Sequence, residues 1–447
     1  DGVLADLAFL NTEQQLPDSL PEQLTIRTGQ LDQFIKSHVF EGFAQDKWTL
    51  RPDTTLSLGL RYDLEIIPLD ETDNPLFPAD NKHYPVDRNN IAPRIGVTHT
   101  LDEAGKSVIR AGYGIFYNRT LLGAVGDVRE FGKYTQSAVV TFPNDSVDPG
   151  PRKGEFPTND FLIKGPFLNR ALLEQLYPPG VPVRNTGVVV FDSPNRQQPY
   201  AHQFMVGYAR EVAPSLSIHA DYVRILGRDL FLARNLNPAV RADTSRTGAL
   251  TRVDVFGVLG EPYSKQVWEM ENNGESTYDA LNLSVEKRHA HHWFCRVSYS
   301  LSSSRGTAEN QTDRDTYQNL DDMNLDLWRG PSVVDRPHVV SVAAQAEIPK
   351  TGGIALATTI RYMSGAHFTI FNSAVDLNRN GELDDPVQAG IYSGTTLNAM
   401  QNVAFDGRRN GARGPDYFQI DVRAGWHHAM KRGKALDVFV DIFNLTN

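Results

Sequence analysis

Side-chain oxygens recur at alternate positions between residues 376 and 384, with Gly381 in the sixth place of the run. Calcium takes six to eight oxygen ligands, and a glycine at this position allows the sharp turn that such loops need. The twelfth position of a complete calcium loop is glutamate, but here it is Val387, so Asp384 or Asp385 would have to substitute. Two interpretations stay open: an extracellular loop that binds Ca²⁺, and an Asn-Gly turn in a solvated loop. In the first, the ligands are Asp376, Asn378, Asn380 and Asp384.

Two groups of histidines raise the question of a transition metal. They are His289, His291 and His292 in one predicted turn, and His427 and His428 beside another. Neither group has a nearby cysteine or a carboxylate partner that the sequence identifies. Solvated turn histidines are therefore the favoured interpretation, and no cofactor is required.

A hydrolase would need a serine beside a histidine and a polar third residue. Ser298, Ser300 and Ser302 alternate along one segment, and His219 occupies an equivalent position in another. Nothing in their spacing brings them together, so the sequence predicts a protein that is not an enzyme.

A larger set of charged residues recurs at alternate positions in apolar segments. Such residues line the water-filled interior of a transmembrane β-barrel, where they tune a pore or hold a plug by ion pairs. The plainer interpretation is solvation of the wall by cross-strand pairs. The predicted lumen-facing residues are Arg61, Asp63, Arg94, Arg110, Asp221, Glu286, Arg296, Arg361, Asp421, Arg423, Asp437 and Asp441.

The elements that position these charges are strands with a two-residue period. In residues 54–63, Leu56, Leu58, Leu60 and Tyr62 alternate with polar residues, which indicates one face for lipid and one for water. The apolar faces end in aromatic residues, as the aromatic girdles of such barrels do. These residues are Tyr62, Tyr113, Tyr117, Tyr222, Tyr299, Tyr362 and Trp426.

The alternating segments group into six hairpins with short turns. We predict strand pairs at 38–50 and 54–64, 91–100 and 107–118, 200–212 and 215–225, 278–288 and 293–303, 338–347 and 354–363, and 416–426 and 435–443. Long loops rich in Pro, Gly, Asn and Asp separate them, at about 64–90, 118–199, 226–277, 304–337 and 364–415. The fold class is thus all-β, an antiparallel transmembrane β-barrel region over 37–447 with about 12–14 strands in view. Residues 1–36 are a lead-in, either first strands or loop.

Composition narrows the function classes. The 447 residues carry a formal net charge of −10, which argues against a nucleic-acid partner. The single cysteine, Cys295, lies within a predicted strand and excludes an intramolecular disulfide. No stretch approaches the roughly 18 apolar residues of a membrane-spanning helix. The chain begins at Asp1 without a secretion signal, so we expect it to be an internal piece of a longer product.

Several segments resemble TonB-dependent outer-membrane receptors, and in particular their Oar-like subgroup. The resemblance extends from about residue 38 to the end. Its motifs are Gln45-Asp46-Lys47-Trp48, Leu56-Ser57-Leu58-Gly59-Leu60-Arg61-Tyr62-Asp63, Asn90-Ile91-Ala92-Pro93-Arg94-Ile95-Gly96, 108–117, Asp335-Arg336-Pro337-His338, 409–415 and Phe443-Asn444-Leu445-Thr446-Asn447.

This resemblance implies a bacterial outer-membrane receptor that binds an unknown ligand in its extracellular loops and moves it across the membrane. Members of the group carry a plug inside a barrel of about 22 strands and receive energy from the TonB complex. We recognise neither a plug nor a TonB box in these 447 residues. The expected partners are outer-membrane lipid, a plug, the TonB complex and the ligand. Two alternatives are a passive unplugged porin and a surface adhesin or structural protein anchored by the barrel.

Overall fold

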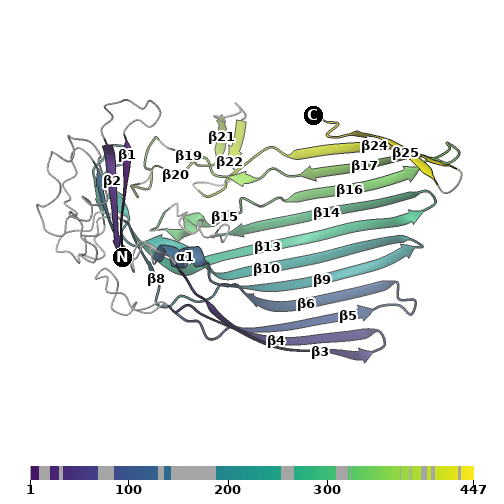
Figure 1. Cartoon of the computed structure of the whole chain (residues 1–447), viewed down its shortest axis with the longest axis horizontal. Helices are drawn as coiled ribbons and strands as arrows, with labels where there is room; N and C mark the ends of the chain where they lie inside the picture. Colours follow the sequence, from purple (N-terminus) through teal and green to yellow (C-terminus); the bar gives the residue numbers. More distant parts are fainter. Residues whose placement is uncertain are drawn as a thin grey trace, which may run out of the picture.

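One large antiparallel sheet dominates the molecule (Figure 1). The computed structural model describes residues 2–9, 21–29, 34–68, 85–128, 135–141, 188–252, 266–308, 321–322, 324–372, 374–381, 383, 385–393, 400–403, 408–430 and 434–446. The principal strands of the sheet are β3 (His38–Arg51), β4 (Thr54–Ile66), β5 (Ile91–Thr100), β6 (Ser107–Tyr117), β9 (Tyr200–Ala213), β10 (Leu216–Asn235), β13 (Val267–Ala290), β14 (Trp293–Gly306), β16 (His338–Glu347), β17 (Ile354–Met363), β24 (Tyr417–Ala429) and β25 (Ala435–Ile442).

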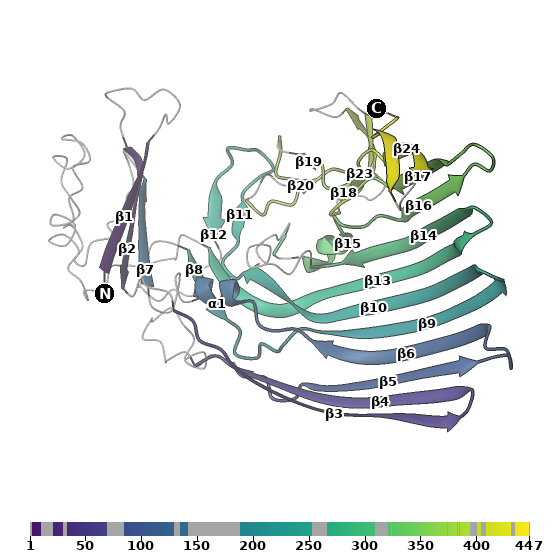
Figure 2. The ribbon, with the colours of Figure 1, turned by 45° about the vertical axis from the view of Figure 1, so that its right-hand side comes forward.

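These strands follow one another in sequence order from β3 to β25, each pairing with its neighbours. Figure 2 shows the sheet curving along this order, and we call it the wall. Two short strands complete its 14: β8 (Val189–Asp192) runs parallel to β13, and β15 (Gly330–Pro331) pairs with β14. The all-β class predicted from the sequence is confirmed, and all six predicted hairpins are present.

The register gives the wall one continuous apolar face. Leu58 lies opposite Ile95, which lies opposite Tyr113, which in turn lies opposite Phe204. Large side chains on this face are left uncovered; Val206, for example, is 55% exposed and Val440 is 61% exposed. A soluble sheet would bury such a face against a second layer, so the side chains need an apolar surrounding from outside the chain.

The two ends of the wall differ. At one end the strands of each hairpin are joined by short turns, at the right of Figure 1, and at the other end by long connections. The short turns use residues suited to a left-handed backbone, such as Gly105 and Gly352 with φ of 68° and 74°. This asymmetry agrees with the predicted arrangement of turns and loops.

The predicted loop boundaries need correction at two strands. β10 continues to Asn235 and β13 begins at Val267, so each extends into the predicted loop 226–277. There the two strands pair with each other, and β13 also pairs with β8. These extensions form a small hydrophobic core together with the short helix α1 (Leu122–Val128). The buried residues of this core are Ala124, Val128, Val190, Ala233, Val267 and Met270. Burial of these apolar side chains offsets the conformational entropy that the extensions lose when they are ordered.

The long connections contain short elements of their own. They are β11 (Ala239–Arg241), β12 (Leu250–Arg252), the 3₁₀ helix η3 (Leu325–Trp328), β18 (His367–Phe368), β19 (Phe371–Asn372), β20 (Asp385–Pro386), β21 (Gly390–Ser393), β22 (Met400–Val403) and β23 (Ala412–Arg413). Predicting the long connections as plain loops was therefore wrong in part. Their pairs are only two to four residues long, too short for an alternating pattern to identify.

The described strands of the lead-in segment 1–36 do not belong to the wall. Its strands β1 (Gly2–Phe9) and β2 (Pro21–Gly29) form a separate three-stranded sheet with β7 (Thr135–Thr141). Of the two predictions for this segment, strands are present, but they pair with a distant part of the chain. Among the described residues, no helix has the length and apolar character needed to cross a membrane.

Candidate functional site

The register places all twelve predicted lumen-facing residues on one face of the wall, opposite to the apolar face. Arg94, for example, lies opposite Gly59 and Gly114, and Asp221 lies opposite Gly207 and Asn282. We call this the polar face. That it lines a water-filled lumen stays a prediction.

An ion pair spans three strands at the middle of the polar face. Both oxygens of Asp221 on β10 accept hydrogen bonds from Arg110 on β6, at 2.7 and 2.8 Å from Nη2. The strand between them contributes Gly207, which the register aligns with both residues. A Cβ atom at Gly207 would lie 2.0 Å from Asp221 Oδ1 and 2.8 Å from Arg110 Nε. The glycine therefore leaves the space through which the pair closes.

Other charges on this face are also paired. Arg61 Nη2 lies 2.9 Å from both Glu41 and Asp63, and Arg296 Nη2 lies 2.9 Å from Glu286. Arg423 pairs with Asp441 and also lies over the Phe439 ring at 4.5 Å. Arg94 stacks in the same way on Phe116. These contacts support wall solvation by cross-strand pairs, which the sequence left as the plainer interpretation.

At the long-loop end of the polar face lies a cavity of about 270 Å³ between β3, β4, β5 and β6. Its deepest acid is Glu65, which is 8% exposed and accepts hydrogen bonds from Ser37, Gln198 and the Thr120 backbone N–H. Arg61, Arg94 and Arg119 also line it. The cavity therefore offers fixed charges of both signs to a polar molecule.

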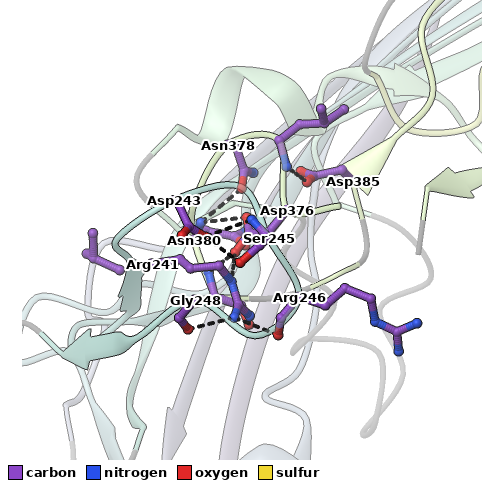
Figure 3. Close-up of polar contacts among 12 residues, drawn as sticks. Arg241, Asp243, Ser245, Arg246, Gly248, Asp376, Asn378, Asn380 and Asp385 are labelled. Atoms are coloured by element: carbon purple, nitrogen blue, oxygen red, sulfur yellow. Dashed lines mark hydrogen bonds and ion pairs between the residues drawn. The ribbon is translucent and has the colours of Figure 1, made fainter. Parts of the chain in front are cut away.

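The predicted calcium loop has a different cation at its centre (Figure 3). Arg241 of β11 donates from Nε to Asp376 Oδ2 at 2.7 Å, and the two side chains are only 5% and 0% exposed. The same guanidinium donates to the carbonyl oxygens of Arg246, Gly248 and Gly381 at 3.0–3.1 Å. Asp376 also accepts from the backbone N–H groups of Asn380 and Gly381. Calcium would have to displace this arginine.

The other predicted ligands make internal contacts. Asn378 accepts from the Asn380 N–H at 3.0 Å, and its amide donates to Asp321 at 3.3 Å. The Leu377 N–H donates to Asp385, whose pKa is raised by burial. Asp384 lies outside the described residues. Among the residues that the structure describes, no cluster of three or more His, Cys, Asp or Glu side chains suits a metal ion. Calcium binding here stays a prediction.

The same contacts tie the long connections together. Arg241 comes from the connection after β10 and Asp376 from the connection after β17, 135 residues apart. The connection after β14 joins them through Asp321, and Asn410 donates to the Pro331 carbonyl at 2.7 Å. We call these three connections the loop unit; they join β10 to β13, β14 to β16 and β17 to β24. Their mutual bonds position any surface that they present together.

Just outside the wall, β13 carries two acids side by side on its extension. Glu269 has its pKa raised to about 7, first because burial disfavours its charge and then because Glu271 lies beside it. Arg234 of β10 donates to Glu271 at 2.9 Å and offsets part of this repulsion.

The prediction that both histidine groups lie in short turns was wrong in part: His291 and His292 form the turn, but His289 lies at the end of β13, and His427 and His428 lie within β24. The histidines also have carboxylate partners. His289 and His292 lie 3.7 and 3.4 Å from the two oxygens of Glu347, and His427 Nδ1 lies 2.6 Å from Asp437. The sequence missed these partners because they come from neighbouring strands. All are exposed surface pairs, which contribute little to stability.

The serine candidates do not assemble with a histidine. His219 lies opposite Ser284, and Ser298 is one strand further along the sheet. Ser302 donates to the Arg336 carbonyl. His219 and these serines therefore lie on separate strands of the polar face, and Ser302 is bonded to a backbone carbonyl and not to His219.

The apolar face is bordered by aromatic residues at both ends. Near the long loops, tyrosine hydroxyls hydrogen-bond polar groups: Tyr62 with the Arg88 carbonyl, Tyr222 with Asp279, and Tyr362 with Asp416. Near the short turns lie Trp48, Trp293 and Trp426. Amphipathic rings in two rows around an apolar band are typical of a membrane boundary.

Comparison with known proteins agrees with this geometry. A family described as outer membrane beta barrel domain matches residues 19–447. The outer membrane transporter YddB from Escherichia coli is similar in structure with a TM-score of 0.52 and 13% identity, over 99% of this chain and 45% of that one. The siderophore receptor PirA from Acinetobacter baumannii has a TM-score of 0.46 and 10% identity, over 99% and 50%.

The chain spans half or less of the length of these two proteins. At such identities the likeness to YddB shows the fold alone. No curated protein matches the chain.

Proposed function

The chain belongs to the family of outer-membrane β-barrel domains, and from this premise we propose that it is the barrel part of a TonB-dependent transporter. In this proposal the long connections bind a ligand outside the cell, and the barrel passes it across the outer membrane. The similarity to the transporter YddB supports this proposal.

The observation that carries the proposal is the loop unit. Short turns face the periplasm in bacterial barrels and long loops face outward, so the loop unit is extracellular. Its three connections are held by buried bonds such as Arg241 to Asp376. A receptor gains affinity from a surface ordered before the ligand arrives, whereas a passive pore needs no such ordering.

The polar face contributes in a second way. Charges on this face form ion pairs, such as Arg110 with Asp221. A plug that covers such a pair does not bury an uncompensated charge, which would be costly. The plug and the TonB complex remain partners that the family resemblance implies. The ligand is a molecule that the loop unit recognises, and its class stays open.

The decisive experiment is the mass and N-terminal sequence of the native polypeptide in the purified outer-membrane fraction. A product about twice this length, with a plug upstream, agrees with the transporter. A mature protein that starts at or near Asp1 would contradict it and favour a passive pore or a barrel-anchored adhesin. Conductance in planar bilayers then separates these two, because only the pore gives a steady open current.

A further inference from the structure

Two arginines lie on the apolar face, where charge is least expected. Arg224 of β10 comes two residues beyond Tyr222, and Arg305 of β14 comes four residues beyond Leu301, each towards the long-loop end. The register aligns Arg224 with Asp279 and Arg305 with Thr277 on the strand between them. Both arginines therefore project from the same face as the exposed leucines and tyrosines.

Along their strands, the two arginines lie at the edge of the apolar face nearest the long connections. Tyr222 is 42% exposed, and its hydroxyl donates to Asp279 at 2.5 Å. Leu281 and Leu283 follow on the side of the short turns and are 37% and 39% exposed. The two arginines therefore lie just beyond the last exposed apolar side chains of these strands. An arginine near the membrane midplane would destabilise the barrel, but at the boundary its stem lies along lipid and its guanidinium reaches the headgroups.

The local acids neutralise the arginines only in part and leave Arg305 without a carboxylate partner among the described residues. Asp279 is engaged by the Tyr222 hydroxyl and by Arg224 at 3.7 Å, and Glu275 pairs with Arg329. Among the described residues, no acid lies within ion-pair distance of Arg305, which is exposed. Three arginines thus face two carboxylates, although the whole chain carries a net charge of −10.

A small hollow lies at the same place. It has a volume of about 220 Å³ and is lined by Thr277, Ser303, Arg305 and Arg329 and by the two acids Glu275 and Asp279. Arg224 does not line the hollow but is paired with Asp279, which does. The hydroxyl groups of Thr277 and Ser303 can donate to an anion, as can the arginines. Guanidinium groups bind phosphate with paired hydrogen bonds, so this combination of donors suits a phosphate group.

We propose that Arg224 and Arg305, with Thr277 and Ser303, form a binding surface for the phosphate headgroups of outer-leaflet lipid. The proposal rests on the assigned orientation, with the long-loop end outward, but not on transport. Charge complementarity selects a phosphate group, and the position on the apolar face selects a lipid phosphate over a phosphate free in solution. The surface would hold lipid at β10, β13 and β14, beside the tyrosine row.

The test uses the native protein purified in detergent and analysed by native mass spectrometry with diphosphoryl lipid A. Dephosphorylated lipid A and inorganic phosphate serve as the two comparison probes. We expect the R224A/R305A variant to bind the phosphorylated lipid about 25-fold more weakly, from about fivefold for each basic residue at a membrane surface. The matched control is R296A/R423A, which removes two exposed arginines from the polar face.

The outcomes are distinct. Weaker binding in R224A/R305A, with normal binding in R296A/R423A and intermediate binding in R224K/R305K, which keeps the charge and loses the paired hydrogen bonds, supports the proposal. Equal binding by the wild type and R224A/R305A overturns it, and so does competition by inorganic phosphate at equal concentration. Heat-modifiable migration on gels identifies any variant that has failed to fold, and the lysine variant then decides. A wild-type protein that takes up its ligand but does not bind diphosphoryl lipid A would refute this surface and leave the proposed transport intact.

Discussion

The Arg241 to Asp376 ion pair gives the sharpest prediction about the loop unit. We consider Arg241→Ala, which removes the guanidinium and leaves the rest of β11 unchanged. Asp376 is fully buried and would remain as a carboxylate without its cation. The carbonyl oxygens of Arg246, Gly248 and Gly381 would lose their donor at the same time.

The expected magnitude follows from burial. Removing one partner of a buried ion pair costs about 3–5 kcal/mol, because the other charge is left uncompensated. None of the residues bonded by Arg241 lies on a wall strand, so the loss falls on local opening of the loop unit. A decrease of about 3–5 kcal/mol in the free energy of local opening lowers hydrogen-exchange protection by about two to four orders of magnitude.

The assay is hydrogen exchange with mass spectrometry on the protein in detergent or nanodiscs. Protection should fall in peptides covering 239–252 and 376–381 and stay unchanged in the wall between β13 and β14. Arg246→Ala is the matched control, since this exposed residue contributes only its backbone carbonyl to the site. Wild-type protection in Arg241→Ala, or an equal loss in Arg246→Ala, would refute the assigned role of the pair.

The same variant tests the calcium prediction. Because Arg241 already neutralises Asp376, we expect calorimetry to detect Ca²⁺ binding to the loop in Arg241→Ala and not in the wild type. Tight binding to the wild type would show that the ion displaces the arginine. The loop would then be a calcium site in the native protein.

Three further perturbations examine the wall and its extension. Leu283→Arg places a charge on the apolar face and should cost about 2–4 kcal/mol, seen as a lower folded fraction on gels, whereas Ser284→Arg on the polar face should assemble normally. Gly207→Ala should break the Arg110–Asp221 pair and lower the free energy of unfolding in urea by about 0.2–1 kcal/mol. Gly112→Ala is the control and should leave the unfolding free energy unchanged, because the nearest neighbour of its new Cβ atom would be 3.7 Å away. For Glu269 the folded pKa of about 7 exceeds the unfolded value of 4.5, so the folded state holds the proton more tightly. The β10–β13 extension should therefore lose protection as pH rises from 4.5 towards 7, and Glu269→Gln should abolish that dependence.

The wall could be predicted from the sequence because the alternation that marks each strand lies within a few consecutive residues. Strands β16 and β17 were predicted with the bounds that the structure gives, 338–347 and 354–363. Both have alternating apolar residues, and the turn that joins them contains Gly352 and Gly353. When every second residue faces lipid, one hairpin reveals its own faces without reference to the remainder of the chain.

The loop unit could not be predicted in this way. The sequence showed alternating oxygens around Asp376 but not Arg241, which comes from a strand 135 residues away. Carboxylate and amide oxygens surround a guanidinium as readily as a calcium ion, so the pattern identified a cation site without identifying the cation. The strand extensions were missed for a related reason, since residues 230–235 are ordered by β13 and a shared core.

The wall and the loop unit are stabilised by different forces, and this separates the tests of their functions. The wall depends on a hydrogen-bonded ladder and an apolar face that only a membrane covers, so Leu283→Arg acts on assembly. The loop unit depends on buried polar bonds between three connections, so Arg241→Ala acts on order outside the membrane. A variant of the loop unit that folds normally but no longer takes up ligand would therefore locate recognition in the loops. Unchanged uptake with a disordered loop unit would instead move recognition to the charged cavity beside Glu65.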